Sequence, residues 1–113
     1  MALIELRDYH YLPDRLDEYR EWAVEAGAFL RDRWDVSGFW IDSGEPVRVF
    51  GSDPMEPKHG PANVSWVIRW ADLEQREAAW DELWEDDDWN AIWARHPGFD
   101  DYLQLSVRFL QEV

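Results

Sequence analysis

The segment from Ile4 to Tyr9 constrains the fold more than any other part of the sequence. It alternates apolar and polar residues with a period of two, which is typical of a β-strand with two unlike faces. Ile4 and Leu6 fall on one face, and Glu5, Arg7 and Tyr9 fall on the other. Because charged groups are rarely buried without partners, we expect Ile4 and Leu6 to face the core. The polar face is expected to meet water, a ligand or another subunit.

The remaining sequence alternates strand and helix patterns. Strands are expected over residues 2–11, 36–43, 63–70 and 101–110, with residues 47–50 as a hairpin extension of the second strand. Helices are expected over residues 13–33 and 73–84, with a short one over 89–93 after the acidic run 85–88. Residues 51–62, with three prolines and two glycines, predict a long loop.

This order of elements predicts an α+β fold of the ferredoxin-like βαββαβ type. In that topology two main helices cover one face of a four-stranded antiparallel sheet. The length of 113 residues and the 46% hydrophobic content fit one domain spanning residues 1–113.

The charge of the chain excludes some classes of partner. Acidic residues number 25 against 11 basic ones, giving a formal net charge of −14, so nucleic acid and anionic membranes are not expected as partners. Cysteine is absent, which excludes disulfides and thiolate chemistry. The sequence shows no secretory leader pattern and no apolar run of membrane-spanning length, so a cytoplasmic location is expected.

The polar faces of the first and last strands are too aromatic to predict simple solvation. They are expected to carry Glu5, Arg7, Tyr9, Tyr11, Tyr102, Gln104, Ser106 and Arg108. A second copy of the sheet is the natural cover. We therefore expect a homodimer through the sheet faces, forming an α/β barrel whose interior holds a ligand or a network of paired charges.

Several short motifs, in order along the chain, resemble the NIPSNAP family. They are Glu5-Leu6-Arg7-x-Tyr9, Pro13, Gly38-Phe39-Trp40, Arg69-Trp70 before Asp72-Leu73 and Arg76, and Asp86-Asp87-Asp88-Trp89. The resemblance implies a dimeric α/β barrel, a superfamily that also contains the antibiotic-biosynthesis monooxygenases and EthD-like proteins. Trp66 stands where family members often carry histidine, Ile68 where they often carry tryptophan, and Asp87 where proline is usual.

The candidate ligand-binding residues are those expected inside the barrel. Glu5, Arg7 and Arg108 are expected to form either a structural charge network or a site for an anion or carbonyl group, with solvent exposure as the remaining alternative. Tyr9 is a candidate hydrogen-bond donor beside them. Of the nine tryptophans, Trp40 and Trp66 are expected nearest a pocket, whereas those at helical spacing predict core or dimer packing.

The histidines and the acidic run do not predict a metal site. His10, His59 and His96 have no ligand-pair spacing, and residues 85–88 lack the spacing and glycine of a calcium loop. No metal and no cofactor are therefore expected. His59 remains a candidate lid residue because it lies in the long loop.

Three classes of function remain open. The first, which the NIPSNAP resemblance favours, is a dimeric barrel that binds a small, partly aromatic or anionic molecule, with an undefined biochemical role. The second is a cofactor-independent monooxygenase or isomerase like those of the sister families, for which Asn63, Trp66 and Arg69 are residues of suitable types. Asn63 and Arg69 fall on the strand face opposite Trp66, which argues against this enzyme. The third is a protein-interaction module without a ligand.

Overall fold

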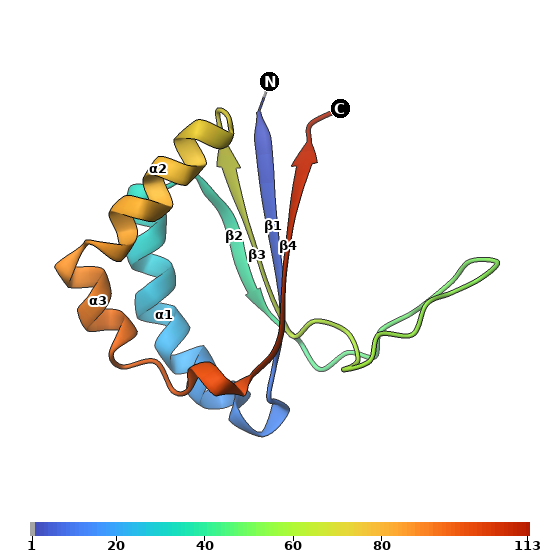
Figure 1. Cartoon of the computed structure of the whole chain (residues 1–113). Coiled ribbons are helices and arrows are strands. Elements are labelled where there is room, and N and C mark those ends of the chain that lie inside the picture. Colours follow the sequence, from blue (N-terminus) through green and yellow to red (C-terminus); the bar gives the residue numbers. More distant parts are fainter. Residues whose placement is uncertain (1) are drawn as a thin grey trace.

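A four-stranded antiparallel sheet carries all its helices on one face (Figure 1). The structure is a computed structural model, and it describes residues 2–113. Its elements are β1 (Leu3–Tyr11), the 3-10 turn η1 (Pro13–Arg15), α1 (Leu16–Arg33), β2 (Val36–Ile41), β3 (Val64–Trp70), α2 (Leu73–Trp84), α3 (Asp87–Trp93), the 3-10 turn η2 (Phe99–Asp101) and β4 (Tyr102–Gln111).

The strand order confirms the ferredoxin-like topology. Across the sheet the order is β2-β3-β1-β4, so that β1 lies between β3 and β4 and both neighbours run antiparallel to it. Arg7 on β1 faces Trp66 on β3 and Val107 on β4. Because residues directly opposite one another lie on the same face, this register decides which side chains meet the helices.

Side-chain caps define where the later helices begin. Asp72 accepts a hydrogen bond from the Gln75 amide at 2.8 Å, and the Gln75 side chain accepts one from the amide of Ala71. Asp86 accepts hydrogen bonds from the amides of Asp88 and Trp89. The acidic run is therefore the start of α3, which begins at Asp87, two residues earlier than expected.

The prediction for the two faces of β1 is wrong. Glu5 and Tyr11 are fully buried and Tyr9 is 6% exposed, because these residues face the helices. Ile4 and Leu6, expected in the core, alternate onto the opposite face of the sheet, which the helices do not cover. We call this uncovered side the open face. The polar residues of β1 are buried because other elements supply partners for them.

The connection between β2 and β3 is a long exposed segment without regular structure. It runs from Asp42 to Asn63 and projects away from the sheet and helices (Figure 1). The long loop expected over 51–62 is confirmed, and it is longer than expected because β2 ends at Ile41. The expected hairpin extension at residues 47–50 is wrong, since those residues form no strand. None of the helices between residues 2 and 113 is long and apolar enough to cross a membrane.

Candidate functional site

A cavity of about 140 Å³ lies between the sheet and the helices. The sheet and η2 contribute Arg7, Tyr9, Phe39, Trp66, Phe99, Tyr102 and Leu105, and the helices contribute Tyr19, Trp22, Ala26, Leu30, Trp80, Trp84, Trp89 and Trp93. Its walls are mostly aromatic, and no carboxylate belongs to this lining. Small-molecule sites usually combine such apolar walls with a few placed polar groups.

The polar end of the cavity is organised by the buried carboxylate of Glu5. Arg76 donates from Nε and Nη2 to its two oxygens, both at 3.0 Å, and Arg7 Nη1 donates at 2.6 Å. The indole groups of Trp70 and Trp80 donate at 2.9 and 3.3 Å. Burial acts to raise the pKa of Glu5, but the bonds from Arg76, Arg7 and Trp70 outweigh burial and hold the pKa below its usual value.

Arg7 is the charged residue at the cavity wall. Its guanidinium lies 4.7 Å from the ring centre of Trp80 and 5.6 Å from that of Trp66, which are cation–π distances. Its Nη1 bonds Glu5 and its Nε bonds the Tyr9 hydroxyl. Within residues 2–113, Arg7 Nη2 has no hydrogen-bond partner. The Arg7 side chain is only 14% exposed. The N–H groups of its Nη2 atom are therefore unpaired donors on a largely buried cation.

The Tyr9 hydroxyl can act only as a hydrogen-bond donor toward any further partner. Its oxygen accepts from Arg7 Nε at 2.5 Å and from Trp66 Nε1 at 2.9 Å, and neither of these groups can accept a hydrogen bond. The Tyr9 O–H therefore has no acceptor among the described residues. Burial raises the pKa of the Tyr9 phenol, so it stays protonated and remains a donor.

A second hydroxyl at the cavity wall, that of Tyr19, ends a directed chain of hydrogen bonds. The Gly98 amide donates to Nδ1 of His96 at 3.0 Å, so the ring hydrogen of His96 is on Nε2. Nε2 lies 2.8 Å from the Tyr102 hydroxyl, which in turn donates to Tyr19 at 3.4 Å. Burial lowers the pKa of His96 to about 4, so this imidazole is neutral at physiological pH.

The Tyr19 O–H and the Trp89 N–H are also free to donate. Tyr19 is 1% exposed, and its hydroxyl hydrogen has no acceptor between residues 2 and 113. Trp89 is 3% exposed, and its buried indole nitrogen has no partner in the described chain. Trp89 Nε1 is thus a buried lining donor with no partner in the described chain, and such an unmatched donor costs about 1–3 kcal/mol. The Tyr9 and Tyr19 oxygens accept hydrogen bonds, and only their hydrogens lack an acceptor.

The site residues expected from the sequence divide between the two faces of the sheet. Glu5, Arg7, Tyr9 and Trp66 are brought together on the helix side. Trp40 lies on the open face, 53% exposed, where its ring covers Gly38 so closely that a Cβ there would be 2.0 Å from it. Trp40 and Trp66 therefore lie on opposite faces of the sheet, and of the two only Trp66 lines this cavity.

Arg108 is also separated from Glu5 and Arg7. The prediction that β4 lies beside β1 is confirmed, but Arg108 is paired with Leu6 and faces the open side. A register shift at His10 and Tyr11 places Tyr102 with the helices, so the polar residues of β4 do not share one face as expected. The predicted network joining Glu5, Arg7 and Arg108 is wrong.

The remaining candidates have other positions. His59 is exposed in the long connection, and its ring centre lies 6.2 Å from that of His10, away from the cavity lining. Asn63 bonds both backbone groups of Tyr11 and so fixes the end of β1. Arg69, on the inner strand β3, pairs with Glu112 just after β4, and both side chains are exposed. The Asn63, Trp66 and Arg69 set suited to an oxygenase does not line one pocket.

Sequence reasoning missed Arg76, Trp70 and Trp80 as partners of Glu5. A signal existed: Trp66 and Trp70 are four residues apart on one strand face, and Arg76 and Trp80 are four apart on one helix face. Both pairs place donors on the side of the element that packs inward. This spacing identifies the partners of Glu5 only once the register between β1 and β3 and the packing of α2 are known.

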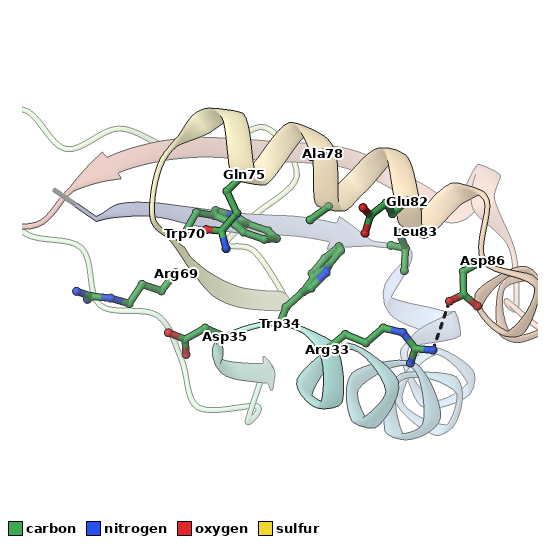
Figure 2. A pocket seen from close by; sticks show the side chains of 11 residues that line it. Arg33, Trp34, Asp35, Arg69, Trp70, Gln75, Ala78, Glu82, Leu83 and Asp86 are labelled. Atoms are coloured by element: carbon green, nitrogen blue, oxygen red, sulfur yellow. Dashed lines mark hydrogen bonds and ion pairs between the residues drawn. The ribbon is translucent and has the colours of Figure 1, made fainter.

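A second, larger hollow of about 530 Å³ lies between the end of α1 and α2 (Figure 2). Figure 2 shows Arg33 directed at Asp86, and this ion pair at 3.3 Å closes one end. Arg69, at the other end, is already paired with Glu112. Both arginines of this hollow are therefore already held in ion pairs. Across residues 2–113 no cluster of histidine or carboxylate side chains is arranged to hold a metal ion.

Comparison with known proteins identifies the fold. No protein-family model and no curated protein matches the sequence. A crystal structure of a NIPSNAP family protein from Agrobacterium tumefaciens is similar, with a TM-score of 0.73 and 19% identity over 99% of this chain and 86% of that chain. An uncharacterised NIPSNAP-like domain protein from Burkholderia xenovorans matches with a TM-score of 0.71 and 16% identity, covering 99% and 85%.

A further NIPSNAP domain protein from Burkholderia xenovorans matches with a TM-score of 0.69 and 18% identity, covering 98% of this chain and 94% of that chain. The match in each case spans nearly the whole of this chain. The resemblance inferred from the sequence motifs is thus matched by the three-dimensional structure. The chain has the fold of NIPSNAP family proteins.

Proposed function

We propose that this NIPSNAP-like protein binds a small anionic molecule with an aromatic body in the cavity between its sheet and its helices. The observation that carries the proposal is the unpaired Nη2 of Arg7 at the polar end of an aromatic cavity. A carboxylate placed there would accept from Arg7 Nη2 and from the Tyr9 hydroxyl. Both donors lack acceptors among residues 2–113.

Charge supports an anion. One buried carboxylate, Glu5, is shared by two arginines, and the other carboxylate near this cluster, Glu77, is 57% exposed and contacts Arg76 only. The positive charge of Arg7 is therefore only partly neutralised, because Arg7 shares the single negative charge of Glu5 with Arg76. A ligand carboxylate would supply the missing charge in a setting where charge-assisted hydrogen bonds contribute about 1.5–3 kcal/mol each.

The size of the cavity supports a single ring. Its volume of about 140 Å³ is close to the roughly 150 Å³ of an engineered apolar cavity in another protein that accepts benzene. Trp80 and Trp66 flank the Arg7 end, and Trp22, Trp89 and Trp93 form the walls beyond it. A benzoate-sized molecule matches both the volume and the chemistry, so it is the probe of choice.

We also propose the homodimer expected from the sequence, but with a structural role and not a role in forming the ligand cavity. The radius of gyration is 15.2 Å, whereas a compact chain of this length has about 13 Å, because the sheet is open on one side and residues 42–63 project. A second copy packed against the open face would cover Trp40 and Leu6. Such a dimer would support the fold without lining the cavity, which belongs to one subunit.

The proposal is tested by calorimetric titration with benzoate and with benzamide, its neutral isostere. Benzoate is expected to bind at least about tenfold more tightly, because only the carboxylate meets the positive charge of Arg7. In Arg7→Met the preference should disappear, and the fold should persist because Glu5 keeps Arg76 as a partner. Arg108→Met, the same change on the open face, should leave the preference intact.

Two results would contradict the proposal. One is equal affinity, or no affinity, of the purified protein for benzoate and benzamide. The other is loss of the benzoate preference in Arg108→Met with retention in Arg7→Met, which would move the site to the open face.

The alternative functions have less support. The four tyrosines near the cavity have raised pKa values through burial, that of Tyr11 to about 12, so none supplies a phenolate base near neutral pH. An oxygenase or isomerase would need another base at the cavity. A protein-interaction role would involve residues 42–63, and it would leave the donors at Arg7 and Tyr9 unexplained.

A further inference from the structure

The hydrogen-bond chain that ends at Tyr19 determines the direction in which this hydroxyl donates. A backbone N–H can only donate, so the Gly98 amide fixes Nδ1 of His96 as an acceptor and Nε2 as the protonated nitrogen. His96 then donates to Tyr102, and Tyr102 donates to Tyr19. With the hydrogen bonds running in this direction, the hydrogen left without an acceptor is that of the Tyr19 hydroxyl.

The position of Tyr19 places that hydrogen at the ligand cavity. Tyr19 is 1% exposed and belongs to the cavity lining, and its hydroxyl has no acceptor among residues 2–113. Tyr9, the donor of the Arg7 end, is separated from it by Tyr102, whose ring centre lies 5.4 Å from that of Tyr9 and 5.9 Å from that of Tyr19. The cavity thus has two distinct hydroxyl donors, and only that of Tyr9 is hydrogen-bonded to a cation.

We propose that the ligand carries a second, uncharged hydrogen-bond acceptor, such as a carbonyl group attached to its ring, to which Tyr19 donates while Arg7 and Tyr9 hold the carboxylate. This inference rests on the proposed function and narrows the class of ligand to aromatic carboxylates that carry a keto or ester group on the ring. An uncharged acceptor fits because Tyr19 has no cation bonded to it. A second carboxylate would be buried without a counter-charge.

The test compares two ligands that differ only in the second acceptor. Acetylbenzoate carries a C=O group where isopropenylbenzoate carries a C=CH₂ group of similar shape, and the 3- and 4-substituted forms of both are titrated by calorimetry. The acetyl form is expected to bind about three- to tenfold more tightly at the better of the two ring positions, which is the usual effect of one hydrogen bond.

Matched variants locate the effect. Tyr19→Phe should remove the acetyl advantage, so that the acetyl and isopropenyl forms bind equally. Tyr11→Phe is the control, because it also removes a buried phenol oxygen, one that donates to the Gly98 carbonyl and does not belong to the cavity lining. It should keep the acetyl advantage. Circular dichroism establishes that both variants remain folded.

The outcomes separate this inference from the proposed function. If benzoate binds in preference to benzamide but the acetyl and isopropenyl forms bind equally at both positions, the Tyr19 inference is overturned and the Arg7 site stands. Persistence of the acetyl advantage in Tyr19→Phe overturns it as well. If the protein binds none of these aromatic carboxylates, both proposals are overturned.

Discussion

Arg76 donates two hydrogen bonds of 3.0 Å to the carboxylate of Glu5, one to each oxygen, and so joins α2 to the central strand of the sheet. This forked arrangement is the strong form of a charge-assisted pair. Since Glu5 is fully buried and also paired with Arg7, the strand and the helix are held together by charge as well as by packing.

We expect Glu5→Gln to lower the free energy of unfolding by about 3 kcal/mol or more. The substitution keeps the shape but leaves two largely buried arginines without their carboxylate, and removing one partner from a buried pair has this order of cost. Urea denaturation followed by tryptophan emission measures it. Glu112→Gln is the control, because Glu112 forms a solvent-exposed ion pair with Arg69. Equal stability of the two variants would contradict a structural role for Glu5.

Stability is expected to fall on acidification in two steps. Burial lowers the pKa of His96 to about 4 from 6.5, so the unfolded chain binds more protons between these values and stability decreases as the pH falls from 6.5 to 4. The pKa of Glu5 is below its ordinary value, so its contribution is lost at still lower pH.

The histidine step is isolated by substitution. Glutamine offers an acceptor for Gly98 and a donor for Tyr102 but does not titrate, so His96→Gln should flatten the pH dependence of the unfolding free energy between pH 6.5 and 4. His59→Gln, in the exposed connection, should retain it. An unchanged slope in His96→Gln would show that other groups cause the loss.

Ligand-induced changes in tryptophan emission should come from the helix side of the sheet. Trp80→Phe is expected to reduce the quenching by an added aromatic carboxylate, because Trp80 lines the cavity beside Arg7. Trp40→Phe should leave the quenching unchanged, since Trp40 is on the open face. Steady-state titration of both variants measures this, and the reverse pattern would place the ligand on the open face.

The proposed dimer should depend on the open face. Trp40→Asp is expected to shift the protein toward a monomer in light scattering after size exclusion, because it places a charge within the interface. Trp84→Asp is a matched control: Trp84 is 50% exposed, close to the 53% of Trp40, but lies on α2 at the other side. Dissociation caused by Trp84→Asp alone would reject the open face as the interface.

Local periodicity predicted the four strands, the main helices and their order, but it also predicted a strand extension at residues 47–50 that does not form. It also grouped Glu5, Arg7 and Tyr9 on one face of β1 correctly, because alternation depends only on strand geometry. The wrong part was the choice of the buried face. The polarity of the residues favoured the face of Ile4 and Leu6 as the buried one. Glu5 can be buried because it has hydrogen-bond partners in β3 and α2, more than sixty residues away in the sequence.

The failure at β4 has a different cause. Tyr102 and Arg108 share a face only if the strand alternates without interruption, but the register shift beside His10 and Tyr11 turns Tyr102 toward the helices. The sequence of β4 carries no glycine or proline to signal this irregularity. The donor arrangement at Tyr9 and Tyr19 was likewise beyond sequence reasoning, since it depends on which neighbour offers each hydrogen.

The most direct test of the central claim is a crystal structure of the protein with 4-bromobenzoate, in which anomalous scattering locates the bromine independently of any model of the ligand. The account predicts a bromine peak among Trp22, Trp89 and Trp93, with the carboxylate within hydrogen-bond distance of Arg7 Nη2 and the Tyr9 hydroxyl. A peak on the open face beside Trp40 and Arg108, with the helix-side cavity empty, would contradict it.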